Sequence, residues 1–536
     1  METEKNSTEY AGELPNTTGS VCPECMKIIA ATIYEDEGKV FIKKTCPEHG
    51  EFKEIYWGSA SMYRKAKRYS YDGKPSENPH VTKDNPVCPK DCGLCSMHKS
   101  HTALANLVVT NRCDLNCWYC FYYAKKAGYV YEPTMDDLEK AVDLLVDQKP
   151  IPGNAIQMTG GNPELRDDII DIIKMVKDKG VDHVQLNING THKFWKDAEW
   201  TRKVREAGIN TVYLSFDGVT PKSNPKNHWE VPYMFENARK AGNMGIVLVP
   251  TVINSVNDHE LGDMLRFGFR NMDIVRGVNF QPVSLVGRMP KKERQKFRIT
   301  IPDTIQRIEE QTNGQVTADD FYPVPSMGAL TNFVEAISGK PSYSLSTHFA
   351  CGMATYVFDD DGKMIPAPKF LDVEGMFEYL DEKAEELKKG ANRAIISAKL
   401  LFKLKSFIDN SKAPKGFSLA KILYNVLVKH DYKSLGILQH KSLFVGMMHF
   451  QDLYNYDINR VKRCCIHYLT PEAIIPFCTF NVLPEMYRDR FQDKYSMSFD
   501  EWKNLSGKKL EDDLYKRDIK KLESSEIYKK TYEGFI

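Results

Sequence analysis

The sequence predicts an α/β protein with three parts: a partial (β/α)6 barrel in the middle, a small rubredoxin-like or zinc-knuckle-like module before it, and a mainly helical domain after it. Between residues 103 and 300, six apolar stretches alternate with amphipathic helical patterns. This alternation is typical of parallel strands joined by right-handed crossovers. The cysteines fall into groups with metal-ligand spacing, and after about residue 300 helical patterns dominate.

The predicted barrel strands are short apolar stretches, each followed by a helical pattern. Six such units are too few for a closed eightfold barrel, so an open or partial barrel is favoured. The helical pattern over residues 134–148 begins at Thr134, a suitable N-cap residue, and the apolar residues that follow form one face of the helix. The strands are expected at residues 105–110, 155–159, 183–187, 211–216, 246–253 and 277–282.

The order of these patterns divides the chain into five segments. The C-terminal segment contains an Asp-Asp-Asp-Gly turn at residues 359–362, which predicts a hairpin. The segments are a loose tail over residues 1–20, a mononuclear metal module over 21–75, an auxiliary-cluster segment over 76–102, the α/β core over 103–300, and a C-terminal auxiliary-cluster and substrate domain over 301–536.

Charge and hydropathy exclude several classes of protein. Lys and Arg number 73 against 72 Asp and Glu, so the chain lacks the basic excess with which proteins neutralise nucleic-acid phosphates. No apolar run approaches the roughly 18 residues of a transmembrane helix, and the acidic start is unlike a secretory signal. We expect a cytoplasmic protein with at most peripheral membrane contact, whose 13 cysteines serve metal or redox chemistry rather than disulfides.

The first metal-binding pattern, the ribbon group, lies in the N-terminal module. It pairs Cys-x2-Cys with Cys-x2-His and supplies four ligands: Cys22, Cys25, Cys46 and His49. This ligand set suits tetrahedral zinc or a rubredoxin-like iron, and spacing alone does not decide between them. A structural role is predicted, because so small a module lacks a core that could fold without a metal.

The central group, Cys113-x3-Cys117-x2-Cys120, directly follows the first predicted barrel strand. It is therefore expected at the carboxyl end of the sheet, where active sites of such folds lie. Three thiolates at this spacing can hold three irons of a [4Fe–4S] cluster, and the next cysteine is 231 residues away. The fourth iron would then be open to a substrate or cofactor. A structural zinc or a closed cluster is the alternative.

Two further groups are predicted to hold auxiliary iron–sulfur clusters. The upstream group repeats the central spacing without an aromatic residue before its last cysteine, and a structural metal is its alternative: Cys88, Cys92 and Cys95. His98 is either its fourth ligand or a surface histidine. The distal group supplies four thiolates, although adjacent cysteines rarely both ligate one cluster: Cys351, Cys464, Cys465 and Cys478.

The Cys-x3-Cys-x-aromatic-Cys motif after the first barrel strand resembles the radical S-adenosylmethionine (SAM) enzymes. The resemblance implies a cluster whose open iron chelates SAM, formation of a 5′-deoxyadenosyl radical, and a backbone contact of Tyr119 with adenine. The turn after the second strand is similar to the family's Gly-Gly-Glu-Pro, which receives the SAM amino group. Asn162 replaces the glutamate and loses a carboxylate contact, within the sequence Thr159-Gly160-Gly161-Asn162-Pro163.

Polar residues at three later strand ends resemble family positions that bind the ribose and carboxylate of SAM. Taken singly, each is better explained as an ordinary loop residue, and only the set together indicates a SAM site. They are Asn187 and Asn189 after the third strand, Ser215 and Asp217 after the fourth, and Asn254 after the fifth.

The order of motifs along nearly the whole chain, including VFDDDGKMIPAPKFLDVEG, resembles tetraether lipid synthase. That radical SAM family was earlier associated with methylation of a hydroxymethyl-dihydropterin. The resemblance implies coupling of two isoprenoid lipid chains by an enzyme with three [4Fe–4S] clusters and a rubredoxin-like metal. It also implies an isoprenoid diether lipid substrate and a low-potential electron donor such as ferredoxin or flavodoxin.

Two alternatives accompany this function. Radical SAM methyl transfer to the pterin predicts a polar, aromatic-lined pocket. A non-enzymatic iron–sulfur electron carrier leaves the Gly-Gly-Asn-Pro turn without a role. Helix packing explains the apolar residues over 392–450, and the alternative is a tunnel or a membrane-facing surface with Lys399, Lys403 and Lys405 toward lipid phosphates.

Overall fold

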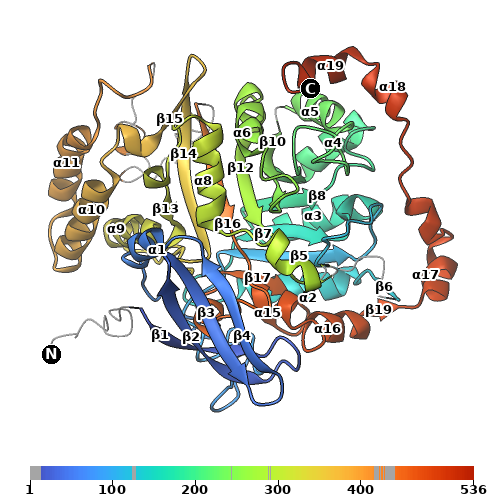
Figure 1. Ribbon diagram of the computed structural model, residues 1–536, viewed down its shortest axis with the longest axis horizontal. Coiled ribbons are helices and arrows are strands. Elements are labelled where there is room, and N and C mark those ends of the chain that lie inside the picture. The colour runs from blue at the N-terminus through green and yellow to red at the C-terminus, as the bar shows by residue number, and fades with distance from the viewer. Residues whose placement is uncertain are drawn as a thin grey trace.

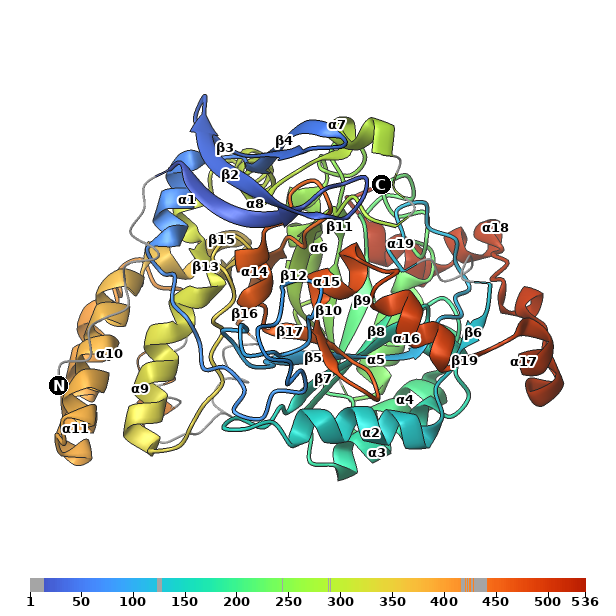
Figure 2. The same cartoon turned by 90° about the horizontal axis from the view of Figure 1, so that it is seen from below.

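The computed structural model of the chain describes residues 14–122, 128–242, 244–287, 289, 291–415, 420, 422, 424–425, 428 and 441–536. Residues 1–13 of the predicted tail, and part of the apolar stretch over 392–450, lie outside the described residues. A small N-terminal sheet packs beside a large twisted sheet, and helices surround the large sheet (Figure 1, Figure 2).

The N-terminal sheet is antiparallel, with strand order β1 (Asn16–Val21), β2 (Ile28–Asp36), β3 (Lys39–Cys46) and β4 (Gly50–Trp57), followed by α1 (Ala60–Lys67). Strand β1 begins inside the segment predicted as a loose tail, so that prediction is wrong for residues 16–20. The strand is held by polar contacts, which hydropathy does not reveal. Thr18 donates to Asp457 and Ser20 to the carbonyl of Tyr456, each at 2.6 Å.

The six predicted barrel strands are all present and parallel. They follow one another in the sheet as β5 (Leu104–Thr110), β7 (Ala155–Gly160), β8 (His183–Ile188), β9 (Thr211–Ser215), β10 (Gly245–Val249) and β12 (Val275–Pro282), and β11 (Thr251–Val252) pairs with β12. As predicted, the Thr134 hydroxyl caps the first connecting helix by accepting the backbone N–H of Asp137 at 3.2 Å. The connecting helices are α2 (Met135–Val146), α3 (Ile169–Asp178), α4 (Ala198–Ala207), α5 (Val231–Lys240) and α6 (Leu261–Arg270).

The C-terminal region extends this sheet at both edges, which the sequence did not indicate. Strand β16 (Ser442–Met448) lies parallel to β12, and β17 (Ile466–Leu469) lies parallel to β5. Strand β14 (Gly352–Asp360) pairs antiparallel with β16, and it forms the predicted hairpin with β15 (Lys363–Pro366). Strands β13 (Tyr322–Pro323) and β18 (Ile474–Pro476) complete the edges. These strands are far apart in sequence, so they lack the strand–helix alternation of the core.

The remaining helices pack around the two edges. Helices α9, α10 and α11 stand together at the left of Figure 1, and the chain from α17 to α19 runs along the opposite side. The bounds are α7 (Arg294–Phe297), α8 (Ile301–Gln311), α9 (Gly328–Ser338), α10 (Val373–Lys388), α11 (Arg393–Leu404), α14 (Ile458–Lys462), α15 (Phe477–Val482), α16 (Arg488–Lys494), α17 (Phe499–Ser506), α18 (Ile519–Glu523) and α19 (Glu526–Tyr532), with a short pair of β6 (Val130–Tyr131) and β19 (Ser496–Met497).

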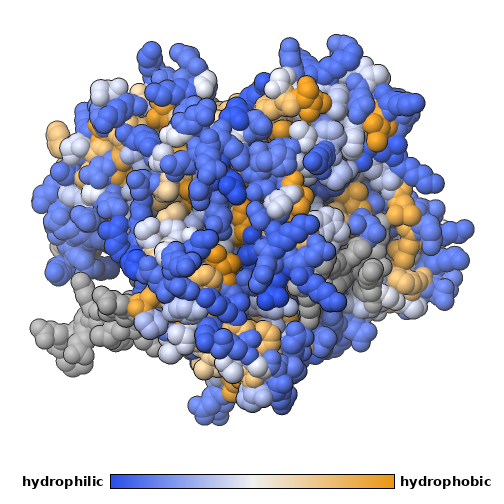
Figure 3. Space-filling model, viewed as in Figure 1, coloured by the Kyte–Doolittle hydropathy of each residue, from blue (hydrophilic) through white to orange (hydrophobic). Residues whose placement is uncertain are grey.

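One hydrophobic core joins the N-terminal sheet to the barrel. It includes Trp57 and Tyr63 from the N-terminal module together with barrel residues such as Leu107 and Ile156. The face in Figure 3 is largely hydrophilic, with apolar side chains in scattered patches. Across the part of the chain that the structure describes, no helix combines the length and the hydropathy needed to cross a bilayer.

Candidate active site and metal centres

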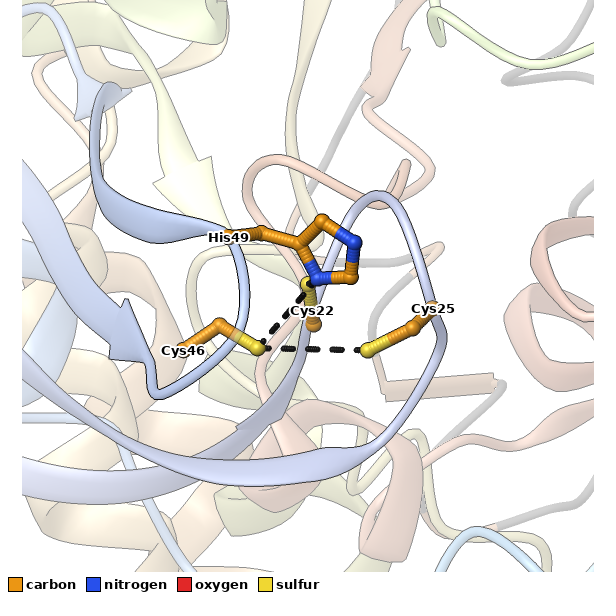
Figure 4. Close-up of side chains that lie close together, drawn as sticks. All are labelled: Cys22, Cys25, Cys46 and His49. Carbon is orange, nitrogen blue, oxygen red and sulfur yellow. Dashed lines mark hydrogen bonds between the residues drawn. The ribbon is translucent and has the colours of Figure 1, made fainter.

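The ribbon group brings its four side chains to one point (Figure 4). Sγ of Cys25 and Sγ of Cys46 lie 3.9 Å apart, and Nδ1 of His49 lies 3.5 Å from Sγ of Cys46 and 3.7 Å from Sγ of Cys22. With ordinary bond lengths, tetrahedral zinc separates two sulfur ligands by about 3.8 Å and a sulfur from a nitrogen by about 3.6 Å. The residues therefore fit a mononuclear metal, as predicted.

Two turns position these ligands. Cys22 follows β1, and its carbonyl accepts the N–H of Met26 at 3.0 Å, which closes the first turn. Cys46 ends β3 and begins the turn to β4. The backbone N–H of Glu48 and the ring of His49 lower the pKa of the Cys46 thiol to about 6. The thiolate, the form that binds metal, thus predominates at neutral pH.

The central group follows β5, as predicted, and the turn after β7 holds the base of its loop. The N–H of Gly161 donates to the carbonyl of Thr110 at 2.8 Å, and that of Asn162 donates to the carbonyl of Arg112 at 2.7 Å. A Cβ atom on Gly160 would lie 1.9 Å from the Thr110 oxygen, and one on Gly161 would lie 2.0 Å from the Arg112 oxygen. Glycine is therefore required at both positions, because this close approach fixes the cysteine loop to the sheet.

A buried polar network lies beside Cys113. Nδ2 of Asn162 donates to Asp114 and Asn189 at 3.0 Å each and to Glu164 at 3.1 Å. Asn189 in turn donates to Asp114 at 2.9 Å, and its Nδ2 lies 3.9 Å from Sγ of Cys113. The Oδ1 atom of Asn162 is buried and has no hydrogen-bond partner. This oxygen can accept a hydrogen bond, and the protonated amino group of an amino acid could donate it.

A second network lies beside Cys117. Nζ of Lys226 lies 2.7 Å from Asp217 and 3.3 Å from the hydroxyl of Tyr119, and it also donates to Ser215. The Tyr119 hydroxyl donates to Asp217. Burial raises the pKa of the Cys117 thiol to about 11, whereas the charge of Lys226 acts to lower it. Lys226 and Asp217 thus place a buried ion pair next to the cysteine loop.

The structure brings together most, but not all, of the residues predicted to contact SAM. Asn187 donates to Thr159 at 3.3 Å, and Pro163 is buried at the turn. Asn254 instead donates to the carbonyl of Lys296 at 2.8 Å and lines a separate cavity of about 540 Å³ between the N-terminal sheet and the segment before α8. Among the described residues, the Asn254 side chain therefore makes no hydrogen bond to the other predicted residues. Its neighbours Ile253 and Val256 nevertheless pack in one cluster with Tyr119.

Several residues of this site were missed in the sequence. Lys226 and Asn227 lie before α5 in a segment without a motif, and Asn227 donates to the carbonyls of Asn189 at 2.6 Å and Ser215 at 2.7 Å. Asp114 could have been found, because it lies inside the cysteine motif.

The upstream group packs against the C-terminal region. The N–H of Cys92 donates to the Tyr487 hydroxyl at 3.1 Å, and its Sγ lies 3.4 Å from Oγ1 of Thr479. His98 is buried, with Nε2 2.8 Å from the carbonyl oxygen of Cys464 and 3.2 Å from Nε2 of His467. The surface-histidine alternative is therefore wrong. One ring nitrogen of His98 is already engaged, and its role as a ligand stays a prediction.

The distal group gathers cysteines from three separate segments. Burial raises the pKa of Cys464 well above its ordinary value, and the charges of Cys478, Cys465 and Cys351 raise it further. Sγ of Cys351 accepts a hydrogen bond from Nε of Arg460 at 3.3 Å. Mutually interacting thiols with a cationic donor on one of them fit an anionic iron–sulfur cluster.

Comparison with known proteins agrees with this geometry. Residues 107–268 match the profile of the Radical SAM superfamily, and residues 14–58 match that of the HMPTM N-terminal zinc ribbon domain. The zinc ribbon match favours zinc over a rubredoxin-like iron in the ribbon group.

Relatives with curated descriptions extend the comparison. The chain is 46% identical over 506 residues to the 7,8-dihydro-6-hydroxymethylpterin dimethyltransferase of Methanocaldococcus jannaschii, which covers 92% of this chain and 98% of that protein. It is 30% identical over 190 residues to GTP 3′,8-cyclase 3 of Mycobacterium tuberculosis, covering 33% of this chain and 48% of that protein. Among solved structures, HydG, a maturase of the [FeFe]-hydrogenase, is 18% identical with a TM-score of 0.33 over 40% of this chain and 50% of that one.

The ribbon metal is expected to depend on Cys46. Cys46→Ala removes one of four ligands, so the variant should lose the single zinc bound per chain and melt at a lower temperature. Elemental analysis and thermal unfolding measure both effects. Cys120→Ala, in the central group, is the control and should keep its zinc. Full zinc content in the Cys46 variant would contradict the assignment.

Glu164 is expected to make stability depend on pH. Burial, with the charge of Asp114, raises the pKa of Glu164 to about 7. The protonated carboxyl therefore favours the folded protein. This contribution to stability is complete below pH 4.5, the ordinary pKa, and is lost as the pH rises through about 7. Glutamine does not ionise, so Glu164→Gln should not lose this contribution, which is of the order of a few kcal/mol. The melting temperature of the variant should therefore rise relative to that of the wild type as the pH increases from about 5 to 8.

The control for this measurement is Glu526→Gln, because the Glu526 side chain is 91% exposed on α19. Its melting temperature should follow the wild type at every pH. Parallel curves for Glu164→Gln and the wild type would show that Glu164 does not titrate as stated.

Proposed function

Because the chain belongs to the radical SAM superfamily, and within it to the family of the Methanocaldococcus jannaschii 7,8-dihydro-6-hydroxymethylpterin dimethyltransferase, we propose that it is a radical SAM methyltransferase acting on a hydroxymethyl-dihydropterin. The extent of the similarity, over nearly all of both chains, supports this substrate class. A low-potential electron donor such as ferredoxin or flavodoxin would supply the electron.

The chain's own residues would hold and orient the reactants. Cys113, Cys117 and Cys120 would hold a [4Fe–4S] cluster with one open iron. When bound, this cluster supplies one electron that splits SAM into methionine and a 5′-deoxyadenosyl radical, which can take a hydrogen atom from an unactivated carbon. Asn162 Oδ1 would accept a hydrogen bond from the SAM amino group, and Lys226 would pair with its carboxylate.

The single observation that carries the enzymatic proposal is a buried amide oxygen without a hydrogen-bond partner together with a buried lysine, paired with Asp217, around one cysteine loop. Asn162 donates to Asn189, whose Nδ2 lies 3.9 Å from Sγ of Cys113, and the charge of Lys226 acts on Cys117. An α-amino acid carries one donor and one anion, so these two groups complement the methionine part of SAM. An electron carrier would need neither group.

The second candidate is the coupling of two isoprenoid diether chains, and helix α11 favours it. The helix buries Ile396, Leu400 and Leu404 and exposes 56% of Ile395 and 78% of Phe402. These two side chains are seven residues apart and project from the same side of the helix. Its charged residues are all basic: Arg393, Lys399 and Lys403. A helix with exposed apolar residues and only basic charges suits an anionic lipid surface.

Products distinguish the two substrates. The reconstituted, reduced full chain is incubated with SAM and either hydroxymethyl-dihydropterin or an isoprenoid diether lipid, and 5′-deoxyadenosine is measured with each. A methylated pterin would support the first proposal. A coupled lipid, with two 5′-deoxyadenosine per new C–C bond, would support the second. No 5′-deoxyadenosine with either substrate would overturn both.

Formation of 5′-deoxyadenosine should require Cys117. Cys117→Ala removes one of three cluster ligands, so the product should fall to background, with a loss of about four irons per chain. Asn254→Ala is the matched control, because Asn254 lines the separate cavity and its removal should leave the product unchanged. Undiminished product in the Cys117 variant would contradict the site.

A further inference from the structure

Arg460 is a buried cation without a carboxylate partner. It lies on α14 with 2% of its surface exposed. Its Nε donates to Sγ of Cys351 at 3.3 Å, and its Nη2 donates to the carbonyl of His449. Asp457 lies close by, but the Tyr56 hydroxyl and Thr18 donate to it instead, at 2.8 Å and 2.6 Å. Within the described residues, no ion pair joins Arg460 to a carboxylate.

The other buried arginines of the described chain each have a carboxylate partner. The pairs and their N···O distances are Arg112–Glu132 at 2.9 Å, Arg166–Asp168 at 2.7 Å, Arg298–Asp452 at 2.5 Å, Arg463–Asp72 at 2.8 Å and Arg488–Asp489 at 2.8 Å. Because an uncompensated charge in a protein interior is strongly destabilising, buried arginines are normally paired in this way. Arg460 must therefore be compensated by another negative group.

The groups that face Arg460 are the thiols of Cys351 and Cys478 and the ring of Tyr56, whose centroid lies 5.8 Å from the guanidinium. Cys351 is its hydrogen-bond partner, and the charge of Cys478 also acts on it. Sγ of Cys478 also accepts a hydrogen bond, from the backbone N–H of Gln451 at 3.4 Å. The Nε2 atom of Gln451 is buried without a hydrogen-bond partner. The distal group thus has three hydrogen-bond donors near it: Nε of Arg460, the backbone N–H of Gln451 and the unpaired Nε2 of Gln451. Such donors stabilise an anionic sulfur cluster.

We propose that Arg460 is the counter-charge of the auxiliary iron–sulfur cluster of the distal group, and that its N–H···S hydrogen bond to Cys351 raises the redox potential of that cluster. Reduction adds one electron to the cluster from the low-potential donor, breaks no bond and makes the cluster more negative by one charge. A fixed positive charge with a hydrogen bond to a ligating sulfur stabilises the more negative state. This role is independent of whether the substrate is a pterin or a lipid.

The proposal assigns Arg460 a positioning and tuning role rather than a catalytic one. Its guanidinium touches a ligand of the cluster and no reacting atom. Charge alone would be supplied by a lysine, whereas the directed Nε–H requires the planar guanidinium. Arg460→Lys and Arg460→Met therefore separate the two parts of the effect.

The test is a potentiometric titration of the reconstituted full chain, followed by electron paramagnetic resonance. The signal of the distal cluster is first identified as the one lost in Cys478→Ala, together with about four irons. Arg460→Met should shift the midpoint potential of that signal to more negative values, and Arg460→Lys should shift it less. Arg166→Met, which removes a buried arginine paired with Asp168, is the matched control and should leave the signal in place.

Each outcome decides the proposal. An unchanged midpoint potential in Arg460→Met at full iron content would overturn it. If Arg460→Met loses the distal irons, the Arg460→Lys variant decides: a lowered potential supports the role, and an unchanged one overturns it. The absence of any Cys478-dependent signal in the wild type would also overturn it. These measurements need no 5′-deoxyadenosine, so they can fail or succeed separately from the proposed enzymatic function.

Discussion

Charge compensation of buried thiols is the constraint on which this structure depends. Each cysteine group has a basic side chain whose charge acts on it: Lys44 on the ribbon group, Lys462 on the upstream group, Lys226 on the central group and Arg460 on the distal group. Because thiolates and iron–sulfur clusters are negative, a nearby cation stabilises them in a folded interior. The four groups thus follow one rule, although they lie in different parts of the fold.

The extended sheet explains how residues so far apart in sequence come to share these sites. Strands β16 and β17 add to opposite edges of the parallel core, and they position the segments that carry the distal cysteines beside the barrel. The loop between them holds the N-terminal sheet through Asp457, which accepts hydrogen bonds from Thr18 and Tyr56. The metal-binding ribbon, the barrel and the C-terminal region therefore form one packed unit.

Local patterns predicted much of this arrangement, and long-range contacts limited the rest. Six barrel strands, the hairpin after β14 and the ribbon ligands follow from periodicity and spacing, which are local properties. Lys226 and Arg460 carry no local motif, because only the folded chain places them beside Cys117 and Cys351. Asn254 follows a barrel strand and lines a cavity beside the N-terminal sheet, so its contact with SAM stays a prediction. The position of a residue in a motif thus predicts which part of the fold it lies in, whereas the contacts of its side chain depend on tertiary packing.

The central claim is that the loop of Cys113, Cys117 and Cys120 holds a cluster with an open iron that binds SAM. The most direct measurement is electron–nuclear double resonance on the reduced, reconstituted chain with SAM labelled by ¹⁵N at its amino group and ¹⁷O at its carboxylate. The account predicts hyperfine coupling of both labels to the cluster, and loss of both couplings in a variant that lacks one of the three cysteines. A reduced cluster signal that shows no coupling to either label, with SAM present in excess, would contradict it.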